Sequence, residues 1–297
     1  MMRFRVRLGA AVTLVASLAV VLALSACTTF VPAAPTSTAS VQRALPRGVT
    51  LTIFQNRSDF APRHLQVEVS NGSAGSITLR SGSFSSAFFA SAAPMGSLPY
   101  ALDPGDQVSF PVVLPKPACS ASAAHPRVSL SFTDAQGRGS ATVSPTVLYN
   151  ALHEINVEDC ARYTFEQVVR ITPGSAVKTV RLQNKNLVGE LAFTFTPTGA
   201  AGSVTIKQID ATTLLDMSFN TRLPLVMTAK SAPVTLILTV SPTRCETHVL
   251  SEDKVGTVVP FHVVTPSTSN GYFGLVLSDT LKFEFYRYFS AACGYPG

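Results

Sequence analysis

Residues that could perform catalysis occur in this chain only as fragments of known motifs. His153-Glu154 begins like the zinc-binding HExxH motif, but Val157 stands where the second histidine ligand is required. Ser175 and Lys178 match the S-x-x-K pattern of an activated serine, which needs a helix start and partner motifs. This pair lies at an expected turn into a strand, so we assign neither fragment a catalytic role.

The other histidines and carboxylates do not suggest a metal site. The five histidines are scattered along the chain, and only His125 and His248 occupy corresponding loops. Asp103 and Asp106 flank a Pro-Gly pair, where aspartate is expected as a turn former. A calcium loop would need more acidic ligands at closer spacing. The sequence therefore predicts no metal, no cofactor and no enzymatic activity.

The most distinctive aromatic segment lies near the C-terminus, where apolar and polar residues alternate over residues 281–289. Read as a last β-strand, this segment places Lys282, Tyr286 and Tyr288 on one face. Tyrosine rings stack on sugars and pack at protein interfaces. We therefore take these three residues as a candidate binding surface, with an ordinary half-buried strand as the alternative.

The N-terminal segment has the layout of a secretory signal peptide, because three arginines precede an uncharged apolar run from Leu8 to Leu24. This run is shorter than the roughly 20 residues of a typical membrane span. Leu24-Ser25-Ala26-Cys27 resembles the lipobox of bacterial lipoproteins, whose cysteine is lipidated after the preceding peptide is removed. The resemblance implies that residues 1–26 are a signal peptide. It also implies that Cys27 anchors the protein to the outer leaflet of the cell membrane, or to the outer membrane of a host with two membranes.

The elements that would position any site read as short β-strands. Charged residues make up only 13% of the chain, which has 18 glycines and 20 prolines. Such a composition is typical of an all-β exported protein with many turns. We expect strands at 51–54, 65–70, 76–80, 108–114, 127–132, 140–143 and 147–157, and then at 177–182, 191–196, 204–209, 234–240, 257–264, 273–277 and 281–289.

The body of the chain contains an internal duplication. The two copies are offset by 126 residues at the matching cysteines Cys119 and Cys245. HLQVEV from His64 corresponds to ELAFTF from Glu190, and later segments follow in the same order. A period of this length indicates two whole domains rather than a solenoid. Each copy resembles a two-sheet sandwich of immunoglobulin or fibronectin type in architecture, although the chain has no tryptophan.

The four cysteines after Cys27 are expected to form disulfides, because an even number in an exported chain favours pairing. Four cysteines allow three pairings, and the repeat selects Cys119–Cys160 and Cys245–Cys293.

The anchor, the duplication and the bridges together divide the chain into segments. We expect a lipidated cysteine and flexible spacer at 27–39, a first β-sandwich domain at 40–160 and a second at 161–297.

The charge of the mature chain is too low to favour nucleic acid. Three of the 23 lysines and arginines lie in residues 1–26, leaving 20 positive against 17 negative residues, a net +3. We expect a non-catalytic, lipid-anchored envelope protein whose two sandwiches bind an envelope protein or a cell-wall polymer. The alternative is an envelope hydrolase or enzyme accessory subunit with a site dispersed along the sequence.

Overall fold

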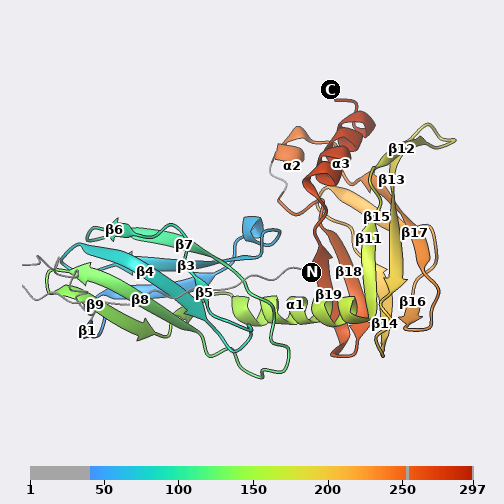
Figure 1. The fold of residues 1–297 in the computed structure, drawn as a ribbon. Coiled ribbons are helices and arrows are strands. Elements are labelled where there is room, and N and C mark those ends of the chain that lie inside the picture. Colours follow the sequence, from blue (N-terminus) through green and yellow to red (C-terminus); the bar gives the residue numbers. More distant parts are fainter. Residues whose placement is uncertain (1–40, 252–253, 296–297) are drawn as a thin grey trace, which may run out of the picture. The chain divides into compact units, whose positions relative to one another are not determined.

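The structure is a computed structural model that describes residues 41–251 and 254–295 (Figure 1). The predicted signal peptide at 1–26, the lipid attachment site Cys27 and the spacer at 27–39 lie outside the described residues. Within the described ranges, no helix combines the length and the apolar character that crossing a membrane requires. The predicted all-β architecture of two tandem antiparallel sandwiches is confirmed.

The first sandwich alternates apolar and polar residues along its strands, so that each strand buries one face. In the strand His64–Asn71, for example, Leu65, Val67 and Val69 are fully buried while their neighbours are not. The strands are β1 (Val41–Gln42), β2 (Val49–Phe54), β3 (His64–Asn71), β4 (Ile77–Ser85), β5 (Ala93–Pro94), β6 (Tyr100–Leu102), β7 (Gln107–Val113), β8 (Arg127–Asp134), β9 (Gly137–Val143) and β10 (Thr146–Val147), with a 3-10 turn at Arg57–Asp59.

These strands form two sheets around one core. One sheet has the order β1-β9-β8-β4-β5, with β6 also paired to β4, and the other has the order β10-β2-β3-β7. The longer strands pair in antiparallel fashion. The two-residue strands β1 and β10 add parallel edges to β9 and β2.

The second sandwich contains β11 (Val169–Pro173), β12 (Lys178–Arg181), β13 (Leu187–Pro197), β14 (Ser203–Ile209), β15 (Leu215–Phe219), β16 (Leu225–Thr228), β17 (Val234–Pro242), β18 (Val259–Thr265) and β19 (Thr268–Leu275). Its sheets have the orders β11-β13-β17-β15, with β12 on β13, and β16-β14-β18-β19. The helices are α1 (Ala151–Val168), α2 (Thr247–Ser251) and α3 (Asp279–Ala292).

The two sandwiches share their strand order. The neighbours β6-β4-β8-β9 correspond to β16-β14-β18-β19, and β2-β3-β7 correspond to β12-β13-β17. Each sandwich also carries one disulfide, Cys119–Cys160 in the first and Cys245–Cys293 in the second. The first bridge joins the loop after β7 to α1, and the second joins the loop after β17 to Cys293 at the end of α3. This is the pairing that the repeat predicts.

Two of the expected strands are helices instead. Most of the segment 147–157 belongs to α1, and the whole of 281–289 lies in α3. In α3 the buried residues Leu281, Phe285 and Tyr288 recur at three- and four-residue spacing, which is the period of one helical face. The side chain of Ser278 also caps this helix by accepting a hydrogen bond from the Leu281 amide at 3.3 Å.

Helix α1 contributes to the cores of both sandwiches. Leu152 and Ile155, near its start, pack in the first core. Phe165 and Val168, in its last turns, pack in the second. The domain boundary predicted after Cys160 therefore falls inside a continuous helix.

Candidate functional site

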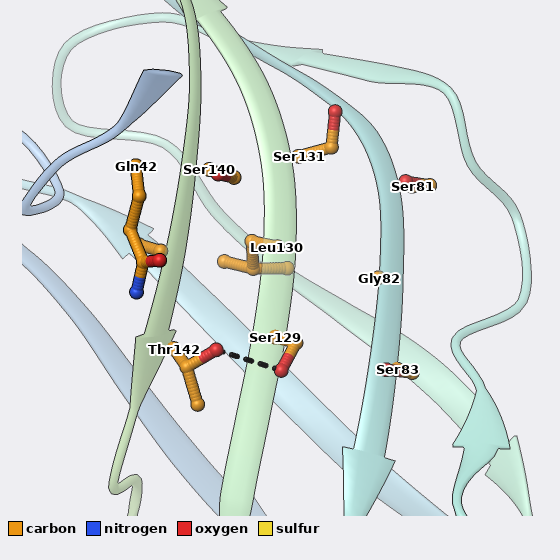
Figure 2. Close-up of a pocket in the computed structure, with 10 residues that line it drawn as sticks. Gln42, Ser81, Gly82, Ser83, Ser129, Leu130, Ser131, Ser140 and Thr142 are labelled. Carbon is orange, nitrogen blue, oxygen red and sulfur yellow. Dashed lines mark hydrogen bonds between the residues drawn. The ribbon is translucent and has the colours of Figure 1, made fainter. Parts of the chain in front are cut away.

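A hollow lined largely by small hydroxyl side chains lies on one sheet of the first sandwich (Figure 2). Strands β4 and β8 turn their large side chains Phe84, Leu130 and Phe132 towards the core, which leaves the intervening residues on the outer face. The hollow has a volume of about 460 Å³. It is lined by Gln42, Ser81, Gly82, Ser83, Ser129, Leu130, Ser131, Ser140, Ala141 and Thr142.

The register of the sheet arranges these hydroxyls in two rows. In the first row Ser81 pairs with Ser131 and Ser131 pairs with Ser140, which in turn lies opposite Gln42 of β1. The second row consists of Ser83, Ser129 and Thr142. Neighbouring strands lie about 4.8 Å apart and alternate residues of one strand about 6.7 Å apart, so the rows form a regular grid of polar groups.

An irregularity in β4 places its serines on the outside. Leu79 is buried, so strict alternation would also turn Ser81 inward, but the register shifts between these two residues. A bulge of this kind inserts a residue and reverses which side chains face the core. Gly82 then faces inward, where an added Cβ would lie 2.4 Å from the sulfur of Met95.

The chemistry of the hollow is that of neutral hydroxyl groups. Ser129 and Thr142 are hydrogen bonded to each other at 2.9 Å. The hydroxyls of the first row, Ser81, Ser131 and Ser140, make no side-chain hydrogen bond to another described residue. Each of these three hydroxyls is therefore available to donate and to accept a hydrogen bond. All lining residues are uncharged, and the short serine and threonine side chains among them lose little conformational entropy when a ligand immobilises them.

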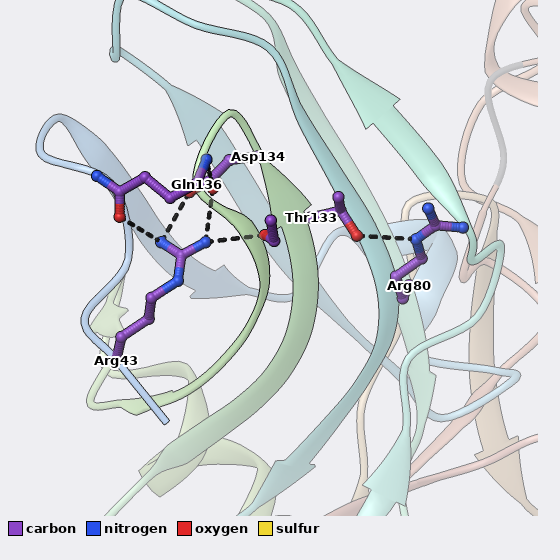
Figure 3. A network of polar contacts seen from close by, with 6 residues as sticks. Arg43, Arg80, Thr133, Asp134 and Gln136 are labelled. Atoms are coloured by element: carbon purple, nitrogen blue, oxygen red, sulfur yellow. Dashed lines mark hydrogen bonds and ion pairs between the residues drawn. The ribbon is translucent and has the colours of Figure 1, made fainter. Parts of the chain in front are cut away.

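Arg43 holds β1 at the edge of this sheet, beside β9 (Figure 3). Its guanidinium donates hydrogen bonds of 2.8 and 2.6 Å to the two carboxylate oxygens of Asp134, and one of 3.0 Å to the Gly137 carbonyl. The hydrogen bond from Arg43 holds the pKa of Asp134 below its ordinary value. The guanidinium carbon also lies 4.6 Å from the centre of the Phe132 ring. These contacts fix the segment that carries Gln42.

The aromatic surface predicted near the C-terminus is not a single exposed face. Tyr288 is a core residue of α3, and its hydroxyl donates to the carbonyls of Val240 at 2.9 Å and Leu187 at 3.2 Å. Burial raises the pKa of Tyr288 to about 12. Lys282 and Tyr286 do lie together, with the ammonium 5.7 Å from the ring centre. The expectation of a strand was wrong here, and Tyr288 points away from its two predicted partners.

A cluster of ionisable groups on α1 was not found from the sequence. Asp159 accepts a 2.5 Å hydrogen bond from Arg63. Burial nevertheless raises the pKa of Asp159 to about 6, an effect that the neighbouring charge of Glu158 reinforces. Burial also raises the pKa of Glu158. The expected strand at 147–157 ended before these residues, so nothing in the sequence pattern placed them beside Arg63.

Comparison with known proteins gives no family. No protein-family model matches the chain, and no curated protein sequence matches it. Among solved structures, the B domain of a biofilm-associated protein is 8% identical, with 80% of this chain and 89% of that chain covered and a TM-score of 0.22. A protein of unknown function from Porphyromonas gingivalis W83 is 9% identical, with 76% and 96% covered and a TM-score of 0.23. The BSP domain of a biofilm-associated protein is 7% identical, with 82% and 61% covered and a TM-score of 0.22. TM-scores below 0.5 support no conclusion about shared fold or function.

Proposed function

We propose that this protein is a non-catalytic, lipid-anchored envelope protein that binds a neutral, hydroxyl-rich cell-wall polymer in the hollow of the first sandwich. The observation that carries the proposal is the grid formed by Ser81, Ser131, Ser140 and the second row beside it. A polymer with many hydroxyl groups offers donors and acceptors at short intervals. The grid also offers hydrogen-bond donors and acceptors at short intervals. Binding would desolvate no charged group of the lining.

The composition of the lining favours binding over catalysis. A serine nucleophile needs an adjacent base to remove its proton. The residues around the hollow include no histidine, aspartate, glutamate or lysine. An envelope hydrolase would therefore need a base from outside this lining, and the hollow gives that alternative no support.

The cellular location in the proposal rests on two features. Disulfides persist in oxidising compartments, and each sandwich contains one. The signal peptide and the lipid on Cys27 are inferred from the resemblance to the lipobox. Together they would tether the sandwiches outside the cytoplasm, next to the wall polymer.

The proposal is tested by co-sedimentation of the full-length protein, in detergent, with host cell wall stripped of proteins by protease and hot detergent. Ser131→Trp fills the centre of the hollow with a large side chain and should weaken binding about tenfold or more, a loss of about 1.4 kcal/mol. Ser109→Trp is the matched control, because Ser109 is exposed on β7 in the opposite sheet. Equal binding by the two variants would contradict the proposal.

A further inference from the structure

A second cavity lies beside the second sandwich, apart from the hydroxyl-lined hollow, and Phe60 of the first sandwich also lines it. Its volume is about 320 Å³, and its walls include residues of α1, β18 and β19 together with the loop at 210–213. Much of the wall is apolar and comes from Val255, Val258, Pro260 and Val276. Val276 is 37% exposed although it is a large apolar residue. A cavity with mostly apolar walls and a few polar groups is the usual form of a small-ligand site.

Two carboxylates line this cavity. The Glu158 Oε1 atom accepts a hydrogen bond from the Gly274 amide at 2.9 Å. The Asp210 Oδ2 atom lies 2.6 Å from Nε2 of His262. The lining contains no lysine, arginine or histidine. Arg63 and Arg162 act on Glu158 electrostatically and His262 acts on Asp210, but none of the three lines the cavity, so the charged groups that face its interior are the two carboxylates.

Tyr272 brings an aromatic ring close to both carboxylates. It lies opposite His262 on the neighbouring strand, and the two ring centres are 5.2 Å apart. The pKa of Tyr272 is raised, first by burial and then by the charges of Glu158 and Asp210. Both acids therefore act on the same phenol, while 41% of the tyrosine remains exposed.

We propose that this cavity binds a small organic cation, with an ammonium group attached to an apolar body. The ammonium would form charge-assisted hydrogen bonds with Glu158 and Asp210. The face of Tyr272 attracts the same charge through its ring electrons. The apolar body would cover the valine and proline walls. Burial, which raises the pKa of Glu158, disfavours its charged form despite the Gly274 hydrogen bond and the charges of the two arginines, and a bound cation would further stabilise that form.

The proposal is tested with three probes of similar shape and different charge: benzylamine, benzyl alcohol and benzoate. Binding to the full-length protein in detergent is measured by saturation-transfer NMR, with empty micelles as the blank. Benzylamine should bind about tenfold more tightly than benzyl alcohol, and benzoate should bind more weakly still. Equal binding of amine and alcohol, or no binding of the amine, would overturn the proposal.

Substitutions of the two carboxylates test whether benzylamine binds in this cavity. Glu158→Gln keeps an acceptor for the Gly274 amide, and Asp210→Asn keeps the shape of the side chain. Each substitution should weaken the binding of benzylamine about fivefold or more and leave the binding of benzyl alcohol unchanged. Asp216→Asn removes an exposed carboxylate of β15 that does not line the cavity. If Asp216→Asn weakens benzylamine as much as Glu158→Gln, general surface attraction explains the binding and the cavity is not the site.

The wild-type comparison of the three probes remains decisive if a variant does not fold, which its melting temperature would reveal. This inference does not depend on the proposed function, because the two sites share no lining residue. Failure of polymer binding would leave the cation site intact, and the reverse also holds.

Discussion

The side chain of Arg43 lies directly against Gly139, where an added Cβ would stand 2.6 Å from Nε of the arginine. The same Cβ would stand 2.8 Å from the Phe132 ring. Glycine at this position thus allows the arginine to cross β9 and reach Asp134. The contact joins the start of the first sandwich to the sheet that carries the hydroxyl-lined hollow.

Gly139→Ala should therefore destabilise the protein by about 1–3 kcal/mol, as overpacking usually does. The measurement is the free energy of unfolding from denaturant titration. Gly75→Ala is the matched control, because nothing lies within 4 Å of a Cβ at Gly75. Equal stability of the two variants would show that Arg43 and Phe132 move aside without cost.

Asp159 should make stability depend on pH. Its pKa is about 6 in the folded protein and near 3.8 in the unfolded chain, so the folded state binds more protons between these values. This contribution is fully present below about pH 4 and is lost as the pH rises through about 6. The difference corresponds to about 3 kcal/mol at 1.36 kcal/mol per pH unit.

The measurement is the free energy of unfolding at a series of pH values for the wild type and Asp159→Asn. The variant lacks the titrating carboxyl, so its stability should fall less steeply over this range. Only the slope is compared, because the substitution also changes the partner of Arg63. Parallel curves for the two proteins between pH 4 and pH 6 would contradict the assignment.

The sequence predicted the strands better than the helices, for a physical reason. Alternation along His64–Asn71 reflects a real half-buried strand, and the repeat aligned the cysteines correctly. The segment after Ser278 also alternates, but its burial follows the helical spacing of Leu281, Phe285 and Tyr288. The serine cap and the adjacent Asp279 were the local signals that favoured a helix.

The hydroxyl-lined hollow was missed because it depends on register. The expected strand at 76–80 stopped before Ser81, whereas β4 continues through a bulge to Ser85. Pairing between strands distant in sequence, such as Ser81 with Ser131, is set by the tertiary fold. No local pattern in the sequence reports it.

Tyr288→Phe should cost stability without affecting polymer binding. The substitution removes the hydroxyl that donates to the buried Val240 carbonyl and the part-buried Leu187 carbonyl, which leaves each with one partner fewer. The expected loss is about 1–2 kcal/mol. Tyr149→Phe is the control, because Tyr149 is 86% exposed. If Tyr288→Phe instead abolished polymer binding and left the free energy of unfolding unchanged, Tyr288 would have to be reconsidered as part of the binding surface predicted from the sequence.

The first disulfide should stabilise the protein substantially. Cys119 and Cys160 are 41 residues apart, and closing a loop of that length contributes about 4 kcal/mol in the chain-entropy model. Replacing both cysteines with serine should therefore lower the melting temperature even though the Cys245–Cys293 bridge stays intact. Peptide mapping of the non-reduced protein checks the pairing, and a Cys119–Cys245 link would contradict it.

The central claim is that the outer face of β4, β8 and β9 binds a cell-wall polymer. The most direct measurement places the photo-crosslinking residue benzoylphenylalanine at Ser131 or at Ser109 of the full-length protein in living cells. We predict that irradiation links the Ser131 position to wall polymer and that the Ser109 position yields no such product. A product of equal yield from both positions, or a protein as the sole crosslinked partner at Ser131, would contradict the account.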